Sequence, residues 1–306
     1  MPLLMEQRTS AVNQQEIGWL CGLIDTDGGT ELTVDPRWNT VKPGMAIKNT
    51  NTCILAKVIE LYRALGVSYY VGETKGTLTN RKQLNISVSG FKRVSRLPKE
   101  ITPILKQWEL DVVRKVAERK LALGKSANDE YVEMLIGEYK KYKFTNRRDP
   151  QRLNVMLSGK NDQFLSGWLA GVIDGDGAIM LTNNSIGHSG KMSIRAVVVI
   201  VAEEIAFAET VLSAVERLGS TGYVQKKGNG SGTIYHVVIA NRSRVYPLLS
   251  AITPYLVGKQ KQAEIAMEFC DLRSSSGYNA PYTKKEYELQ RSVKALNARG
   301  NSEMMI

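Results

Sequence analysis

Alternation of apolar and polar residues predicts the strands of this chain, and apolar residues spaced three to four positions apart predict its helices. Residues 30–35, Thr-Glu-Leu-Thr-Val-Asp, alternate in this way, which predicts a strand with one covered and one polar face. Helical spacing runs through 54–65 and 205–218, and each segment stops at a glycine, Gly66 or Gly219. Further alternation predicts two strand pairs, 69–74 with 83–88 and 222–227 with 233–240.

The chain repeats itself at half-chain spacing. The eleven residues that begin at Gly18, GWLCGLIDTDG, return from Gly167 as GWLAGVIDGDG, with eight of the eleven positions identical. Shorter matches continue in the same order: Leu-Gly at 65 and 218, Tyr-Val at 70 and 223, and Ile-Thr-Pro at 101 and 252. A repeat that fills each half predicts two copies of one structural unit.

Each unit has the predicted order helix, two strands, helix, two strands, helices. The fold class is therefore α+β, with two pseudo-symmetric αββαββα halves that each contain a twisted antiparallel sheet. We expect an N-terminal half over 1–148, a linker over 149–162 and a C-terminal half over 163–306.

Three short segments receive separate predictions. The basic residues 140–143 could be a tether, but their repeat partner follows the capping box Thr283-Lys284-Lys285-Glu286, which favours a helix. The run Gly-Asn-Gly-Ser-Gly at 228–232 predicts a mobile hairpin connection, and Ser-Ser-Ser-Gly at 274–277 predicts a flexible loop.

Composition narrows the possible chemistry. No apolar run approaches the roughly 20 residues of a membrane helix. The three cysteines are widely spaced and provide neither a disulfide framework nor a CxxC metal site. The two histidines, His188 and His236, are too few for zinc or histidine-based nuclease chemistry, so a catalytic metal would need oxygen ligands. The net charge of +11 favours an anionic partner such as nucleic acid.

The repeated motif combines glycines with aspartates. Gly22 and Gly171, each four positions after another glycine, leave little side chain on one helix face, so two motif helices could pack backbone to backbone. If they pack in parallel, their C-terminal ends meet and bring Asp27 and Asp176 together, each facing the negative end of its own helix dipole. Such a pair is repulsive without a cation, and Mg²⁺ is the cation that best suits carboxylate and phosphate oxygens.

Both motif copies resemble the LAGLIDADG signature of homing endonucleases, and the similarity covers essentially the whole chain. The resemblance implies a monomeric, site-specific DNA endonuclease that hydrolyses one phosphodiester bond per strand and leaves short 3′ overhangs. It also implies that Asp27 and Asp176, with Gly28 and Gly177 beside them, hold about two or three Mg²⁺ ions. Mn²⁺ or Ca²⁺ would substitute in binding.

The resemblance also assigns helper residues. Lys259, in the segment LVGKQKQ, is similar to a lysine that orders catalytic waters or steadies charge in this family. Its partner at the Ile-Thr-Pro offset is Trp108, so Lys106, two residues earlier, is the candidate substitute. Glu203 takes the place of a polar catalytic residue of the metal shell, with Thr50 as its counterpart. We therefore expect one strand to be cut with less help than the other.

The remaining motif residues are expected to be structural. Asp25 and Asp174 would cap or hydrogen-bond near the helix ends, and Trp19 and Trp168 would belong to the core rather than stack on bases.

Two sheets side by side would form a saddle around the motif helices, with a polar face that can follow the major groove on both sides of the cut. The resemblance to homing endonucleases implies a double-stranded DNA target of about 22 base pairs. Alternation nominates twelve DNA-binding side chains: Glu31, Thr33, Arg37, Thr74, Lys82, Asn85, Thr182, Asn184, Arg195, Gln225, Lys227 and His236.

Two alternatives remain open. Some homing endonucleases act as maturases that bind group I intron RNA, with or without cleavage, and a non-cutting DNA-binding regulator could use the same scaffold. The presence of both motif aspartates favours cleavage. Because residues 1–14 lack a secretory pattern, we expect an intracellular protein of a mitochondrion, a chloroplast or a prokaryotic cytoplasm.

Overall fold

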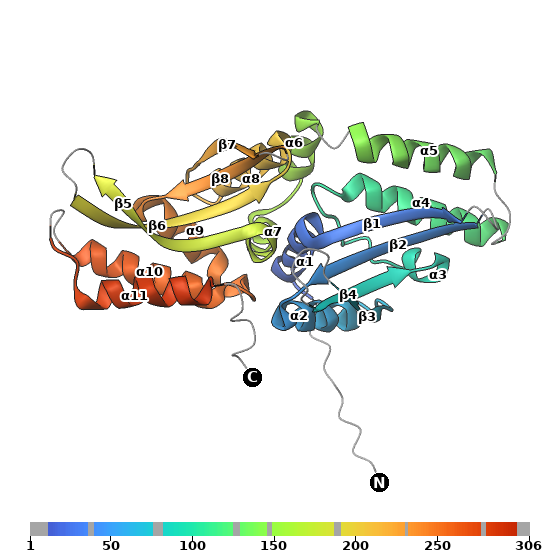
Figure 1. The fold of residues 1–306 in the computed structure, drawn as a ribbon. Helices are drawn as coiled ribbons and strands as arrows, with labels where there is room; N and C mark the ends of the chain where they lie inside the picture. The colour runs from blue at the N-terminus through green and yellow to red at the C-terminus, as the bar shows by residue number, and fades with distance from the viewer. Residues whose placement is uncertain are drawn as a thin grey trace, which may run out of the picture.

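The computed structural model describes the following residues of the chain: 12–35, 40–75, 82–124, 129–145, 149–186, 191–229, 232–276 and 280–298. Within these residues each half contains one antiparallel four-stranded sheet, and helices cover one of its faces (Figure 1). This is the α+β organisation that the repeat predicts. No helix of the described segments is both long and apolar enough to cross a membrane.

The first half follows the predicted order of elements. Its helices and strands are α1 (Gln14–Asp27), β1 (Gly28–Asp35), β2 (Thr40–Asn49), α2 (Thr52–Ala64), β3 (Tyr70–Lys75), β4 (Lys82–Ser89), α3 (Phe91–Val94), α4 (Gln107–Leu123) and α5 (Glu130–Thr145). A capping box starts α1, because the Asn13 side chain accepts from the Glu16 backbone and Glu16 accepts in return from the Asn13 backbone. The basic segment 140–143 lies inside α5, as predicted.

The second half repeats this order, and after its sheet the 11-residue helix α9 takes the place of the 4-residue helix α3. Its elements are α7 (Asp162–Asp176), β5 (Gly177–Ile186), β6 (Lys191–Ala202), α8 (Ile205–Arg217), β7 (Tyr223–Asn229), β8 (Gly232–Ala240), α9 (Arg242–Ile252), the 3₁₀ turn η2 (Thr253–Tyr255), α10 (Gln260–Ser275) and α11 (Lys284–Leu296). The capping box of Thr283 and Glu286 starts α11, which confirms that prediction.

The two predicted loops have different outcomes. The hairpin at 228–232 does join β7 to β8, whose pairing extends to Asn229 opposite Gly232, and 230–231 lie outside the described residues. The loop at 274–277 was placed too early, because Ser274 and Ser275 belong to the last turn of α10. Their hydroxyls donate to the carbonyls of Cys270 and Asp271 four residues back, which keeps serine compatible with the helix. Gly277 lies outside the described residues.

The segment expected as a linker, 149–162, contains a helix, α6 (Pro150–Ser158). The Asp149 side chain caps it, and Pro150 occupies its first turn. The apolar side of α6 is buried, and Arg217 of α8 donates to the carbonyls of Leu157 and Lys160. Arg152 of α6 lies over the Trp108 and Tyr142 rings of the first half, so the connection is packed against both halves.

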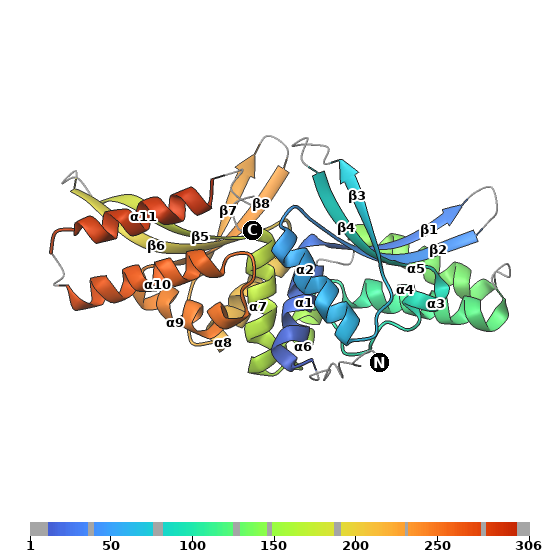
Figure 2. The same ribbon diagram turned by 90° about the horizontal axis from the view of Figure 1, so that it is seen from below.

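The two sheets have equivalent topology, with strand orders β1-β2-β4-β3 and β5-β6-β8-β7. Their registers match as well, since Gly28 pairs with Ile47 and Gly177 with Ile200. Every position of one sheet can thus be assigned a counterpart in the other. The two sheets extend to either side of the central helix pair α1 and α7 (Figure 2).

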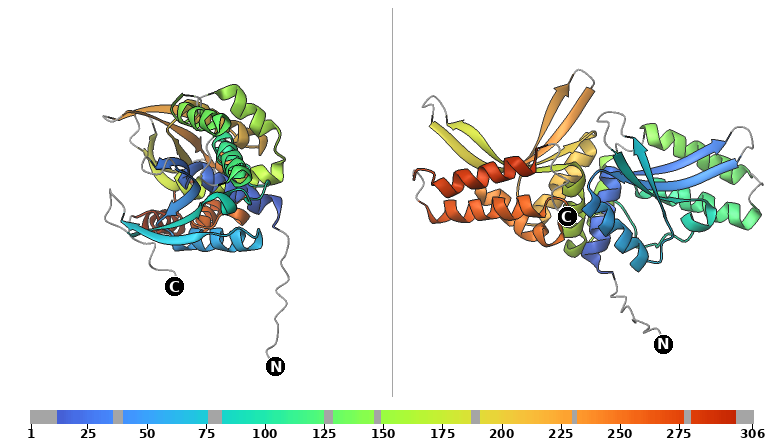
Figure 3. Two further views of the ribbon diagram at one scale, coloured as in Figure 1. Left: turned by 90° about the vertical axis from the view of Figure 1, so that its right-hand side faces the viewer. Right: turned by 60° about the horizontal axis from the view of Figure 1, so that its bottom comes forward.

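Helices α1 and α7 stand side by side in the centre of the molecule (Figure 3). A β-carbon on Gly22 would lie 2.1 Å from the Trp168 carbonyl oxygen, and one on Gly171 would lie 2.1 Å from that of Trp19. Gly18 meets the Phe164 carbonyl one turn earlier in both helices, so the helices run in parallel. The glycine faces therefore pack backbone to backbone, as the motif predicts, and the two tryptophans are buried in the core.

Gly22→Ala should destabilise the protein because its β-carbon cannot avoid the backbone of α7. Overpacking typically costs about 1–3 kcal/mol, and we expect the upper end of this range here because the obstacle is backbone rather than a flexible side chain. Gly137→Ala in α5 is the matched control, since Gly137 is exposed and an added β-carbon meets nothing within 4 Å. That variant should gain about 0.5–1 kcal/mol from reduced chain entropy. Urea unfolding of both variants tests the contact, and equal stability of the two would contradict it.

Candidate functional site

Asp25 near the end of α1 is a buried carboxylate with three hydrogen-bond donors. Its Oδ2 accepts from the Trp168 indole at 2.9 Å and from the Ile104 backbone N–H at 2.7 Å, and its Oδ1 accepts from the Lys106 backbone N–H at 2.9 Å. Burial raises the pKa of Asp25, and these donors and the Lys106 charge oppose the rise. Asp25 thus fixes the loop that precedes α4, in agreement with the expected structural role.

Asp174 does the same at the end of α7. It accepts from the Trp19 indole at 2.9 Å and from the backbone N–H groups of Val257, Gly258 and Lys259 at 2.8, 2.9 and 2.9 Å. Each tryptophan therefore donates to the aspartate of the opposite helix. These crossed hydrogen bonds connect the two halves through the same carboxylates that bind the backbones of the loops before α4 and α10.

Each of these loops delivers one lysine to a helix end. The Lys106 ammonium donates to the carbonyls of Thr26 and Gly28 at 3.3 and 2.6 Å, and the Lys259 ammonium donates to that of Asp174 at 2.5 Å. Each lysine also occupies the residue just before its helix, α4 or α10. The two ammonium groups offset the negative C-terminal ends of α1 and α7.

Lys106, not Trp108, is therefore the counterpart of Lys259. The sequence offset was wrong here because the second half has two more residues between Pro254 and its lysine than the first half has after Pro103. Trp108 instead packs its ring against Tyr142 of α5, with centroids 4.1 Å apart. Both halves thus carry the lysine, and the expected asymmetry at this position is absent.

Asp27 lies at the C-terminal end of α1, close to the charge of Asp176. The Asn49 amide donates to its Oδ2 at 2.6 Å, and the Asn49 carbonyl oxygen accepts in turn from the Asn51 backbone at 2.6 Å, which fixes the amide orientation. Burial and the neighbouring Asp176 raise the pKa of Asp27 to about 6, while Asn49, Lys259 and Lys106 oppose the rise. The two carboxylates are thus near enough to repel each other.

Asp176 at the end of α7 experiences a different set of charges. Burial and Glu203 raise its pKa, and Lys106 of the first half is the strongest of the positive charges that lower it. For Asp27 the stronger of the two lysines is Lys259 of the second half. Of the two lysines, the one from the opposite half therefore acts more strongly on each aspartate.

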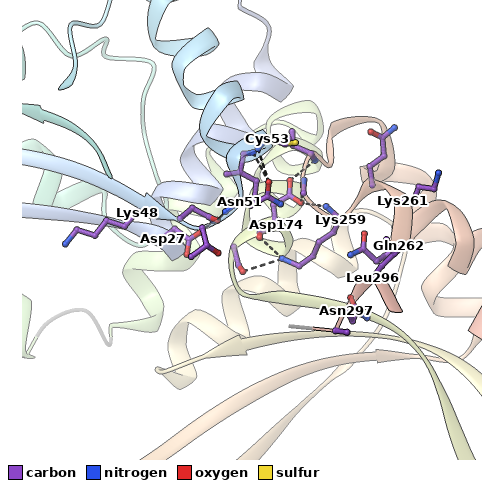
Figure 4. A pocket seen from close by; sticks show the side chains of 18 of the residues that line it. Asp27, Lys48, Asn51, Cys53, Asp174, Lys259, Lys261, Gln262, Leu296 and Asn297 are labelled. Carbon is purple, nitrogen blue, oxygen red and sulfur yellow. Dashed lines mark hydrogen bonds between the residues drawn. The ribbon is translucent and has the colours of Figure 1, made fainter. Parts of the chain in front are cut away.

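Two cavities flank the helix ends and show the same crossed pairing. One, of about 680 Å³, is lined by Asp27 and Lys259 (Figure 4), and the other, of about 200 Å³, by Asp176, Lys106 and Glu203. Each cavity thus combines a carboxylate from one half with an ammonium from the other.

No protein-family model and no curated protein sequence matches this chain. Solved structures do match. I-AabMI, a LAGLIDADG meganuclease bound to uncleaved DNA, aligns with a TM-score of 0.66 and 16% identity, over 91% of this chain and 98% of that one. I-LtrWI, a LAGLIDADG homing endonuclease bound to target DNA, aligns with a TM-score of 0.65 and 14% identity, over 92% of this chain and 97% of that one. I-SmaMI, bound to uncleaved DNA in the presence of calcium ions, aligns with a TM-score of 0.64 and 12% identity, over 92% of this chain and 97% of that one.

The fold is that of the single-chain LAGLIDADG homing endonucleases. In this LAGLIDADG fold the ladder register makes Thr50 the counterpart of Glu203, as expected from the sequence. Asn49, which contacts Asp27, was missed, and its counterpart is the apolar Ala202. The only signal for Asn49 was a polar residue at a strand end beside Thr50. The polar shell of the two aspartates is therefore asymmetric.

The carboxylate oxygens of this LAGLIDADG site suit a divalent cation that takes only a few of its ligands from the protein. In the described part of the chain no three Asp, Glu, His or Cys side chains cluster closely enough to form a complete metal cage. Mg²⁺ is commonly held by one or two carboxylates plus water and phosphate oxygens, which matches Asp27 and Asp176. The backbone oxygen of Gly28 already accepts from Lys106.

Ten of the twelve nominated DNA-binding residues lie in described strands at positions consistent with one face. Along β1, Leu32 is buried while Glu31 and Thr33 are exposed, which identifies the face turned away from the helices. Strand register places seven others on the corresponding faces: Asn85, Thr182, Asn184, Arg195, Gln225, Lys227 and His236. Thr74 joins them by the register of its backbone alone.

Two nominated residues have other outcomes. Arg37 lies outside the described residues. Lys82 pairs with Lys75 at the start of β4, out of phase with Asn85, so simple alternation cannot put both on the DNA-facing side. Sequence reasoning also missed Lys48 of β2, which is exposed and pairs with Asn85.

Asp27→Asn should stabilise the metal-free protein at neutral pH, because it removes a charge that is disfavoured first by burial and then by the neighbouring Asp176. An aspartate with a folded-state pKa of about 6 against 3.8 unfolded destabilises the fold progressively between these values and fully above pH 6. The gain should reach up to about 3 kcal/mol above pH 6 and vanish below about pH 4. Thermal unfolding in EDTA between pH 4 and 7.5 measures it, and a gain that does not change with pH would contradict the assignment.

Proposed function

We propose that this protein is a monomeric, site-specific DNA endonuclease of the homing type that requires a divalent metal ion. The observation that carries this proposal is the crossed pairing of Asp27 with Lys259 and of Asp176 with Lys106 in two adjacent cavities. A duplex presents two scissile phosphates, one per strand, and each cavity has the charges to bind one. The proposed product is a double-strand break with short 3′ overhangs.

Double-stranded DNA is the proposed partner for the sheet faces next to these cavities. Two polar atoms there, Asn85 Oδ1 and Arg195 Nε, are buried and lack a hydrogen-bond partner among the described residues. Such atoms are satisfied when a ligand or water supplies the missing bond. The net charge of +11 favours a polyphosphate, and I-AabMI and I-LtrWI are similar structures that were solved with DNA. We propose a target of about 22 base pairs, long enough for the major groove on both sides of the cut.

Mg²⁺ is the proposed cofactor, held by Asp27 and Asp176. Bound there, it would stabilise negative charge on the phosphate oxygens as a Lewis acid. Asn49 keeps the Asp27 carboxylate oriented through its own bond to the Asn51 backbone. The two lysines hold positive charge beside the carboxylates, so that phosphate can approach a site that would otherwise be strongly negative. The I-SmaMI structure contains calcium ions, which agrees with use of divalent metal in this fold.

The proposed setting is an organelle or a prokaryotic cell that carries a mobile intron, where the enzyme would cut intron insertion sites. A maturase role on the intron RNA is the competing function. Cleavage by this chain that depends on its motif aspartates would show that the endonuclease activity is retained.

Asp27→Asn and Asp176→Asn should each abolish double-strand cleavage while DNA affinity stays within about threefold of wild type, because each removes a metal ligand and adds no bulk. Targets would be selected by cleavage of a randomised library in Mg²⁺, and affinity would be measured in Ca²⁺. If both variants lost binding as completely as cutting, the aspartates would be binding residues and not metal ligands for catalysis.

Lys106→Ala and Lys259→Ala should each slow cleavage at least about tenfold, since removal of a positioned charge at a reacting phosphate commonly costs more than that. Lys115→Ala is the control, because Lys115 is an exposed lysine on the same helix α4, roughly 13 Å of helix beyond Lys106. It should cleave at the wild-type rate. A Lys106 variant that cleaves as fast as the Lys115 variant would contradict the equivalence of Lys106 and Lys259.

A further inference from the structure

The DNA-facing side of the second sheet carries an apolar patch. Val197, Val238 and Ala240 form a hydrophobic cluster separate from the main core, with Met180 and Val199 packed against it. Strand pairing aligns Val197 with both Met180 and Ala240, and Val199 with Val238. These positions alternate with the buried residues that contact the helices, so the cluster lies on the opposite face.

Val201 continues this row toward the catalytic end of β6, and its side chain is 36% exposed. We refer to these six residues, Met180, Val197, Val199, Val201, Val238 and Ala240, as the apolar patch. Val197, Val238 and Ala240 at its centre are buried, Met180 and Val199 are partly exposed, and Val201 is exposed.

The first sheet has a different character at the matched positions. Ladder register assigns the counterparts, in the same order, as Glu31, Gly44, Ala46, Lys48, Ser87 and Ser89. At the accessible positions Met180 therefore replaces a glutamate and Val201 replaces a lysine. The first sheet presents groups that can hydrogen-bond, and the second presents methyl groups.

The surroundings of the patch identify its occupant. Val201 lines the cavity that contains Asp176, so the patch begins beside the proposed cleavage site. Arg195 and Lys227 lie on the same face, on strands β6 and β7. A surface bounded by cations and continuous with a phosphate-binding cavity suits the major groove of the duplex that is being cut.

We propose that the apolar patch reads thymine methyl groups in the half-site bound by the second sheet, close to the cut. This inference rests on the proposed function. In the major groove the thymine C5-methyl is the one apolar feature that distinguishes a base pair, and aliphatic side chains recognise it by contact. The second half-site is then read by methyl contacts near the cut as well as by its polar side chains, whereas the first is read by polar groups at the matched positions.

The test uses duplexes selected by cleavage of a randomised library with the full-length protein. Thymines should be enriched in one half-site near the cut. Replacement of these thymines by deoxyuridine removes only the methyl group and keeps every base pair and groove acceptor. Affinity, measured in Ca²⁺, should fall up to about fourfold per methyl removed, and the same replacement in the other half-site should have little effect.

Protein variants assign the effect to the patch. Val199→Thr and Val201→Thr keep the side-chain shape and replace one of the two methyl groups by a hydroxyl, so each should reduce the deoxyuridine penalty. Ala46→Ser, at the position matched to Val199 in the first sheet, should leave the penalty unchanged. Unfolding temperatures close to wild type would show that all three variants fold.

Several results would overturn the inference. These are an absence of thymine enrichment, equal tolerance of deoxyuridine in both half-sites, and a penalty that is undiminished in both valine variants. A dimer that Val201→Thr disperses would likewise show that the patch binds a second copy and not DNA. If cleavage occurs without any methyl effect, the endonuclease proposal stands and methyl reading is wrong. If no duplex is cleaved, both proposals are wrong.

Discussion

The direct contact of α1 and α7 is the constraint on which the rest of the structure depends. Glycines at Gly18, Gly22, Gly167 and Gly171 remove the side chains that would hold the two helices apart, so carbonyl oxygens of each helix occupy the space that a β-carbon would need. Because the helices run in parallel, both C-terminal ends reach one place. That arrangement brings two negative helix ends and two carboxylates together, which is electrostatically unfavourable by itself. The surrounding residues compensate for this cost.

The compensation is built by a second pair of carboxylates. Asp25 and Asp174 are buried, and each fixes a loop by accepting from its backbone N–H groups. Each loop then delivers a lysine whose ammonium group binds the carbonyls at a helix end. The crossed indole bonds from Trp19 and Trp168 couple this arrangement across the halves. The motif thus encodes both the contact and the means of balancing its charge, while Asp27 and Asp176 remain available for a cation.

The sequence predicted most of this fold because the repeat supplied the same evidence twice. Order of elements, glycine contact and core tryptophans all follow from local pattern and were confirmed. The sequence offset placed the counterpart of Lys259 two residues too late, at Trp108, because a constant offset cannot detect a short insertion. The hydrogen bond from the Lys106 backbone to Asp25 identifies Lys106 as the counterpart. Asn49 was missed because its role depends on the distance between a strand end and a helix end. The alternation rule failed at Lys82, because Lys82 is three residues before Asn85 in β4 and alternation assigns residues three apart to opposite faces.

The apolar face of the second sheet shows the same limit. A run of apolar residues over 196–202 gives no phase, so the sequence could not say which of its valines face away from the helices. Pairing with β8 resolves it, because Val199 lies opposite Val238 and in phase with Val197. The two sheets therefore differ in chemical character at matched positions near the helix ends. The first sheet has Glu31 and Lys48 where the second has Met180 and Val201.

The central claim is that Asp27 and Asp176 share divalent cations at the end of the helix pair. The most direct measurement is anomalous X-ray scattering from Mn²⁺ in crystals of the protein bound to a selected target duplex. The account predicts anomalous peaks within coordination distance of both carboxylates and of a phosphate oxygen on each strand. Mn²⁺ peaks that avoid these two aspartates, with DNA bound across the sheets, would contradict it.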